Sequence, residues 1–267
     1  MRRFPFVLLA LTSLPLVPAV AQRGPEANLV LTILAGTITG HSLWTVEKQP
    51  LCLGNPCSGL YDTLHLARSI NSSTMLGVAA TFFPSPHLGF HAEVSYVGLP
   101  IDSGCSGVFN PDAQHTDEQI CDDISAQAAS GGAIAILGGL TLRAASRRAF
   151  SPYVRGSLGL VSLSRSTIEV SGRYLTSGGA VVERVIIVDD TPRRTSPMVG
   201  AAVGFTSPIG SGYQFRLEAR DILTALDRLI GPANSLGEGP TAKRYYHHFA
   251  LTLGLDVVLE KKRGRRY

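Results

Sequence analysis

The chain has 267 residues and a formal net charge of +4 at pH 7, with 16% charged and 45% hydrophobic residues. Soluble domains usually carry about 25% charged residues, so this chain is poor in charge for a soluble domain. Several of its basic residues lie at positions 261–267, and nothing resembles the basic face of a nucleic-acid-binding protein.

The N-terminus has the three parts of a secretory signal peptide. Arg2 and Arg3 form a basic start, residues 4–17 are apolar, and residues 19–21 (Ala-Val-Ala) form an A-x-A cleavage site. The apolar run is too short for a transmembrane helix and is interrupted by proline. We therefore expect residues 1–21 to be removed on export.

The rest of the chain offers no candidate for a helical membrane span. Its longest apolar stretch, residues 128–142, is too short and contains two Gly-Gly pairs. Only helices and closed barrels satisfy all backbone polar groups in lipid. A membrane protein with this sequence must therefore be a β-barrel.

Eight segments alternate between apolar and polar residues, and this period of two is typical of β-strands. Their connections are alternately short and long, as in a sheet that is threaded through a membrane from one side. The pattern predicts an eight-stranded antiparallel up-and-down transmembrane β-barrel within residues 22–260. The expected strands are Leu29–Thr39, Thr74–Phe83, Leu88–Val97, Gly132–Arg143, Tyr153–Leu163, Met198–Ser207, Tyr213–Ile222 and Phe249–Leu259.

The narrow interior of such a barrel decides which face lies inside. Side chains only just fill an eight-stranded barrel, so the many large apolar residues are expected to face lipid. Glycines and charged residues then occupy the lumen, and the charges must pair because isolated buried charges are costly. The alternative is a soluble secreted lipocalin-like barrel that binds a small apolar ligand. The expected lumen charges are His91, Glu93, Arg143, Arg155, Arg216, Glu218, Arg220 and Asp256.

The last strand carries Thr252-x-Gly254-x-x-Val257-x-Leu259. This spacing is similar to the polar-x-Gly-x-x-apolar-x-apolar signal that the barrel-assembly machinery recognises. Together with eight strands, it makes the chain resemble small outer-membrane β-barrel proteins of the OmpA/OmpX type. The resemblance covers roughly Leu29 to Leu259, in pattern rather than in sequence identity. It implies a monomer in the outer membrane of a Gram-negative-type bacterium, with outer-membrane lipids and the barrel-assembly machinery as partners.

The chain departs from this type because it continues beyond the last strand in a basic tail, residues 261–267. We expect the tail to be a solvated periplasmic end, and contact with lipid phosphates is the alternative. Both termini then lie in the periplasm. The long connections, residues 40–73, 98–131, 164–197 and 223–248, therefore face outward.

Four cysteines, Cys52, Cys57, Cys105 and Cys121, lie in the first two long loops. An even number in an exported chain indicates disulfides. The local pairs Cys52–Cys57 and Cys105–Cys121 are the simplest of three connectivities. The spacing lacks the repeated C-x-x-C of a zinc site, and we expect no metal.

The loops carry three further patterns. Residues 167–175 and 180–188 are rich in β-forming residues around Ser-Gly-Gly, which predicts a hairpin that continues the fifth and sixth strands. Helical spacing of Leu223, Leu226, Leu229 and Ile230 predicts a short helix. Residues 60–70 form either an extension of the second strand or a separate turn.

The second loop is acidic. It is interpreted as a solvated loop that a disulfide bridges, with cation binding as the alternative; its acidic residues are Asp112, Asp117, Glu118, Asp122 and Asp123.

Catalysis is the alternative to a structural role. His247 and His248 lie at the expected outer rim, and His41, Ser42 and His65 lie in the first loop, where a Ser/His pair would suit a lipid A acyltransferase or deacylase. No family motif surrounds them, so we do not expect an enzyme.

His91 and Glu93 share the lumen face and could act as a general-base pair. We prefer an ion-paired core with Arg216 or Arg220. The sequence has no phosphate-binding or haem motif, and no cofactor is expected. The expected function is a structural or surface-interaction role, with an extracellular partner that the sequence does not identify. A narrow ion channel remains a further alternative.

Overall fold

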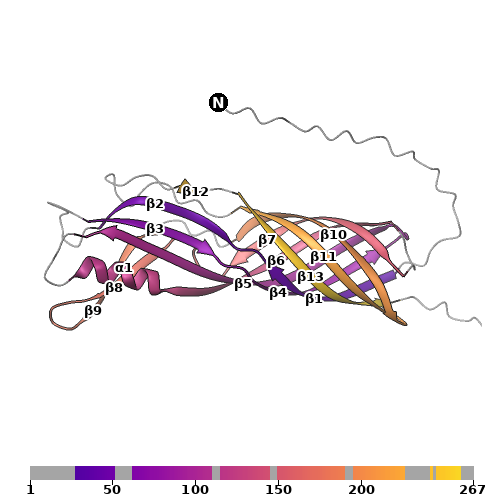
Figure 1. Ribbon diagram of the computed structural model, residues 1–267. Helices are drawn as coiled ribbons and strands as arrows, with labels where there is room; N and C mark the ends of the chain where they lie inside the picture. Colours follow the sequence, from indigo (N-terminus) through magenta and orange to yellow (C-terminus); the bar gives the residue numbers. More distant parts are fainter. Residues whose placement is uncertain are drawn as a thin grey trace, which may run out of the picture.

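The computed structural model describes residues 28–51, 62–109, 115–144, 149–189, 195–225, 241–242 and 245–259. The molecule is elongated, with a β-barrel at one end and a smaller folded part at the other (Figure 1). The expected signal peptide, the basic tail, Cys52 and Cys57 lie outside the described residues.

Eight antiparallel strands close into a barrel, which confirms the predicted architecture. Each strand pairs with its neighbour in the chain, and the last pairs with the first. All eight predicted segments are strands, and several extend beyond the predicted ends. The barrel strands are β1 (Asn28–Ile38), β4 (Ser73–Phe83), β5 (Leu88–Val108), β6 (Ala128–Arg143), β7 (Ser151–Leu163), β10 (Thr195–Gly210), β11 (Tyr213–Ala225) and β13 (Tyr245–Leu259).

The side chains of the barrel point as predicted. Phe90 and Leu253 are 53% and 52% exposed on the outer surface, whereas Glu93 and Arg216 are only 2% and 4% exposed. Large apolar side chains surround the barrel, and soluble proteins rarely expose so continuous an apolar surface. This orientation argues against the soluble lipocalin-like alternative.

The first long connection continues the barrel sheet instead of forming a loop. β2 (His41–Leu51) follows β1 after a break at residues 39–40, and β3 (Asp62–Ile70) precedes β4 after a break at residues 71–72. β3 pairs with both β2 and the far half of β5. Residues 62–70 are therefore an extension of the second strand. A Cβ at Gly40 would lie 2.0 Å from the carbonyl oxygen of Ile70, so the break permits a close backbone approach.

The other described loop elements pack beside this extension. They are α1 (Thr116–Ala126), β8 (Val170–Leu175), β9 (Val181–Ile187) and β12 (Thr241–Ala242), which pairs with β2. We call β2, β3, residues 99–108 of β5, α1, β8 and β9 the distal region (Figure 1). Buried residues that include Leu64, Ile120 and Ile187 give it a hydrophobic core, which is continuous with the barrel interior.

The predicted hairpin exists, but its expected continuity with the barrel strands is wrong. β8 and β9 form a separate two-stranded sheet, joined by a turn in which Gly179 has a φ of 77°. Trp44 Nε1 donates to the carbonyl oxygen of Thr167 at 3.0 Å, and Arg68 donates to that of Glu169. These bonds hold the chain after β7 against β2 and β3, so the hairpin packs on α1 and does not prolong β7.

Two other loop predictions also need correction. The acidic second loop is interpreted from the sequence as a solvated loop, but it contains α1, which buries Ile120 and Ile124, and the extended β5. Leu223 was expected in a helix but lies in β11, and residues 226–230 lie outside the described residues. Among the described residues, no helix is long and apolar enough to cross a membrane.

The disulfide Cys105–Cys121 joins β5 to α1, as predicted. The closed loop spans a sequence separation of 16, so its loss should destabilise the distal region by roughly 3 kcal/mol. We expect the double variant Cys105→Ser/Cys121→Ser to be cleaved faster by protease near α1. The barrel should keep the different gel mobilities of folded and boiled forms. Equal cleavage rates in the variant and the parent would contradict this expectation.

Candidate functional site

Charged side chains fill the half of the barrel lumen that is remote from the distal region. Glu218 on β11 is fully buried among them. Arg155 Nη1 on β7 lies 3.0 Å from Glu218 Oε2, and the hydroxyl of Tyr153 donates to the same oxygen at 2.5 Å. Arg220 Nε pairs with Glu218 Oε1. One carboxylate thus holds side chains from two strands together across the lumen.

Glu93 on β5 connects the opposite wall to the same group. Arg220 Nη1 lies 2.5 Å from Glu93 Oε1, and His91 Nε2 lies 3.3 Å from Glu93 Oε2. His91 Nδ1 is 3.3 Å from the hydroxyl of Thr81. His91 and Glu93 therefore contact each other inside an ion-paired core, as the preferred sequence interpretation expects.

A second ion pair lies closer to the short-turn end of the barrel. Arg216 donates from Nε and Nη2 to the carboxylate of Asp256 at 2.8–3.1 Å. Thr32 donates its hydroxyl hydrogen to Asp256 Oδ1 at 2.8 Å. This two-pronged contact fixes the positions of both side chains and joins β1, β11 and β13.

The lumen charges are balanced, which limits the cost of burying them. We define the charge network as Glu93, Arg155, Arg216, Glu218, Arg220 and Asp256, which comprises three carboxylates and three guanidinium groups. Opposite charges and hydrogen bonds offset the desolvation of buried ions only when each is well paired. The network therefore obstructs the lumen without leaving a net charge among these six side chains.

Arg143 lies near the end of the barrel. Its Nε donates to the carbonyl oxygen of Pro86 at 3.0 Å, and its guanidinium carbon lies 4.0 Å from the centroid of the Phe83 ring. It shares a small cavity with Arg216 and Asp256. Its described partners thus belong to the short-turn end of the barrel.

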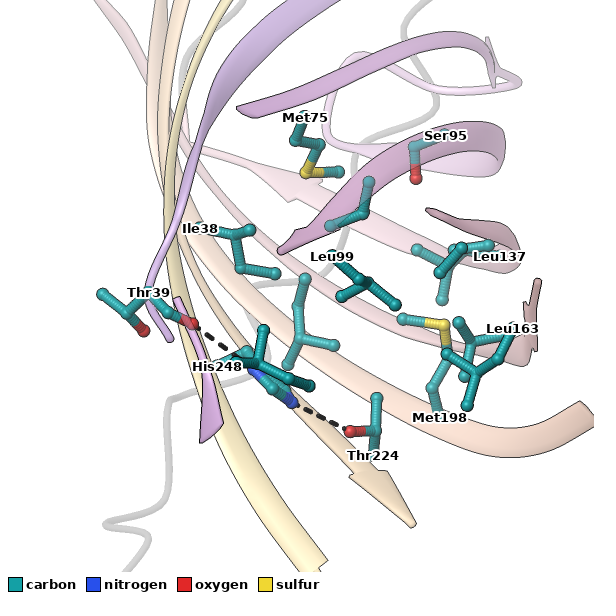
Figure 2. Close-up of a pocket in the computed structure, with 16 residues that line it drawn as sticks. Ile38, Thr39, Met75, Ser95, Leu99, Leu137, Leu163, Met198, Thr224 and His248 are labelled. Carbon is teal, nitrogen blue, oxygen red and sulfur yellow. Dashed lines mark hydrogen bonds between the residues drawn. The ribbon is translucent and has the colours of Figure 1, made fainter. Parts of the chain in front are cut away.

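The other half of the lumen is apolar and contains a cavity of about 50 Å³ (Figure 2). We call this cavity the upper chamber. It lies directly beyond the charge network, because Val97 follows Glu93 on the same face of β5, and Ile222 follows Arg220 on β11. Its chief lining side chains are Met75, Val97, Ala135, Leu137, Met198 and Ile222.

One histidine lies at the edge of the upper chamber. His248 Nε2 is 3.1 Å from the hydroxyl of Thr224, and Nδ1 is 3.5 Å from the carbonyl oxygen of Thr39. The rings of His41 and His248 meet edge to face, with centroids 4.9 Å apart. Figure 2 shows His248 between Thr39 and Thr224, beside the apolar side chains.

The other rim residues that suggested catalysis lie apart from the chamber lining. His247 Nδ1 is 3.1 Å from Asp221, and His65 Nδ1 is 2.8 Å from Glu47. Ser42 is exposed on β2. The described hydrogen bonds of these histidines and of His248 go to a carboxylate, a threonine or the backbone rather than to a serine.

The residues of the assembly motif occupy both faces of β13. Thr252 is buried and its hydroxyl lies 3.4 Å from the carbonyl oxygen of Glu218, whereas Leu259 is 46% exposed. Gly254 stands opposite Arg216, and Val257 opposite Tyr213 on β11. The motif thus combines lumen positions with outward apolar positions.

Sequence reasoning found the charge network but missed the upper chamber. The chamber residues continue the lumen face of their strands, two positions beyond the glycines and charges that were identified. Met75 stands two residues before Gly77, and Ile222 two residues after Arg220. Following each lumen face to the strand end would have revealed an apolar zone.

The described residues contain no cluster of three or more His, Cys, Asp or Glu that could hold a metal ion. Within the second loop, Asp123 instead pairs with Arg173, with Arg173 Nη2 3.1 Å from Asp123 Oδ1. Asp112 lies outside the described residues.

Comparisons with known proteins identify only similar structures. No family model matches, and no curated protein matches. Neisserial surface protein A has 12% identity, 87% coverage of this chain, 99% coverage of its own chain and a TM-score of 0.43. The outer membrane protein OprG of Pseudomonas aeruginosa has 10% identity, with 89% of this chain and 98% of its own chain covered and a TM-score of 0.47. Ail of Yersinia pestis has 8% identity, with 88% of this chain and 100% of its own chain covered and a TM-score of 0.35. The likeness is one of fold alone.

Proposed function

We propose that the protein is a monomeric outer-membrane β-barrel of a Gram-negative-type cell, which presents the distal region to the outside for surface interaction. The lumen is closed and the role is not enzymatic. The observation that carries the proposal is that the long loops fold into a region with buried hydrophobic residues, a disulfide and a helix.

The outer surface of the barrel supports the membrane location. Ile33, Leu158 and Val203 are 66%, 67% and 59% exposed, and they come from three different strands. In water such a surface would drive association, whereas in a bilayer it contacts acyl chains. The short connections at one end suit the periplasm, and this supports the proposed location of the distal region outside the cell.

The distal region also exposes apolar side chains that a partner can contact. Val181 and Leu175 on the β8–β9 hairpin are 65% and 53% exposed, and Val108 at the end of β5 is 85% exposed. Exposed apolar groups on a region held rigid by a disulfide suit protein recognition, because little conformational entropy is lost on binding.

The contact between α1 and β8 should depend on pH. Burial raises the pKa of Asp123, but hydrogen bonds from Arg173 and Gln127 outweigh this and leave the pKa below its ordinary value of 3.8. The lowered pKa means that the contact stabilises the fold above pH 3.8 and is lost as the pH falls through the lower folded-state pKa. We expect Asp123→Asn at pH 7 to lower the protection factors for hydrogen exchange in α1, and to abolish the further loss of protection that acidification causes in the parent. An unchanged exchange rate in the variant would contradict this.

Surface interaction is tested by separating the barrel from the distal region. A variant in which residues 166–189 are replaced by a short Gly-Ser linker is expected to assemble in the outer membrane. In a strain that lacks the native chain, it should fail to restore cell adhesion or autoaggregation, while the full chain restores it. An impermeant maleimide should label Gly178→Cys in intact cells. Full restoration by the trimmed variant, or no labelling, would refute the proposal.

The charge network is expected to prevent ion flow. The purified protein in planar bilayers should show no stable conductance, because side chains from β5, β7 and β11 meet across the lumen. Refolded protein with verified gel mobility provides the control for assembly. Reproducible unitary currents would support the narrow-channel alternative.

Assembly by the barrel-assembly machinery rests on the last strand. Leu259 faces outward at its end, and Thr252 faces the lumen, which fits the alternating signal. Depletion of this machinery should leave the protein unfolded in the periplasm, detected by loss of the heat-modifiable form.

A further inference from the structure

We infer that the upper chamber is a binding site for a short alkyl chain, with His248 at the polar end of the site. This goes beyond the proposed surface role, because the chamber lies inside the barrel and the distal hairpin does not line it. The inference rests on three features of the chamber: its lining, its closed floor and its adaptable walls.

The lining is chemically suited to hydrocarbon. Twelve of its sixteen residues are apolar, and the polar ones are Ser95, Thr39, Thr224 and His248. The side chains of Thr224 and His248 already hydrogen-bond to each other. Apolar cavities do not retain water, since water there lacks the two to four polar partners that it needs. An alkyl group loses no hydrogen bond on entering such a space.

The chamber is closed toward the short-turn end of the barrel. Glu93, two residues from Ser95 on the same face of β5, is ion-paired with Arg220, two residues from Ile222 on β11. The buried ion pair forms a floor that separates the chamber from the short-turn end. A ligand therefore arrives from the bilayer or from the outer side.

The walls can adapt to an occupant. The chain has three methionines, and both that follow Met1 line the chamber, namely Met75 and Met198. Methionine is unbranched and flexible, and it fills or frees space at low cost. Ala133 and Ala135 leave open the space that larger residues would fill. The present volume of about 50 Å³ fits only a few carbon atoms, so a short chain is the appropriate ligand class.

The two methionine methyl groups provide a direct measurement. Protein with 13C-methyl methionine is reconstituted in nanodiscs of chain-deuterated phosphatidylcholine and titrated with hexane. Saturable chemical-shift changes are expected for Met75 and Met198. Ala135→Leu, which fills the chamber, should weaken the response at least tenfold. Ala201→Leu, the same change at an exposed position on the outer surface, should leave it unchanged.

Two measurements, one with protonated lipid and one with hexane, identify the source of the alkyl chain. If nuclear Overhauser contacts from these methyls to acyl protons appear with protonated lipid and are lost in Ala135→Leu, the occupant is a bilayer lipid. A saturable response to hexane without such contacts identifies a free small molecule. Either result supports the site.

The inference is overturned if the shifts rise linearly without saturation, if Ala135→Leu responds like the parent, or if neither lipid contacts nor hexane shifts occur. Gel mobility of each variant establishes folding first. If Ala135→Leu does not fold, Ala133→Val provides a smaller filling change on the same wall, with the same expected outcome.

Discussion

Ile33→Arg should destabilise the barrel by about 2–4 kcal/mol, whereas Val181→Arg should change its stability by less than about 0.5 kcal/mol. The two side chains are almost equally exposed, at 66% and 65%. Ile33 lies midway along β1, however, and Val181 lies on β9 in the distal region. The difference therefore depends on the solvent around each residue and not on burial within the protein.

The physical reason is the transfer of a guanidinium group into hydrocarbon. An arginine at the bilayer midplane loses hydration that only partial snorkelling and local thinning restore. Urea unfolding in phosphatidylcholine vesicles, followed by the gel mobility of the folded form, measures the difference. Equal stabilities for the two variants would mean that Ile33 faces water, and the membrane assignment would then be wrong.

The barrel could be predicted because its pattern is local and repeated. The segment around Phe90 alternates strictly, and the same period recurs eight times with connections of alternating length. A period of two residues indicates a strand with two different faces, whether its apolar face contacts a protein core or lipid. The orientation followed from volume, since large residues such as Phe90 do not fit in so narrow an interior.

The distal region was less predictable because its elements depend on contacts made after folding. α1 has an acidic sequence of 11 residues, and the preceding His115 has a φ of 48° with no side-chain cap hydrogen bond. Its helical signal is limited to Ile120 and Ile124, four residues apart. The packing of these two residues in the distal core, and the disulfide at Cys121, hold a helix that local propensity alone does not indicate.

The members of the charge network could be predicted, and Arg220 was one of the two partners expected for Glu93, but the choice between Arg216 and Arg220 could not be made from the sequence. Glu93 and Arg220 are 127 residues apart in the chain and meet across the lumen. Their pairing depends on the stagger between strands and the tilt of the barrel, which no local pattern encodes. The alternation pattern predicts that a side chain faces the lumen. Its position along the barrel axis, and therefore its ion-pair partner, depends on the register of the closed sheet.

The largest stability loss is expected for Glu218→Met, at about 3–5 kcal/mol. Of the carboxylates that the structure describes, only Glu93 then stays near Arg155, with Oε2 at 3.9 Å, and Arg220 loses one of its two ion-pair partners. Six balanced charges become five with an excess positive charge in a buried site. Glu183 is an exposed residue of β9, so Glu183→Met removes a carboxylate of the same kind from the surface and should change stability by less than about 0.5 kcal/mol.

The double variant Arg155→Met/Glu218→Met separates charge pairing from simple loss of packing. It leaves two complete ion pairs, Glu93–Arg220 and Arg216–Asp256, and should therefore be more stable than Glu218→Met alone despite carrying one more substitution. The coupling between the two positions should exceed about 2 kcal/mol in urea unfolding of the reconstituted protein. Additive losses would instead show that Arg155 and Glu218 contribute independently, and that the lumen is stabilised by packing rather than by balanced charge.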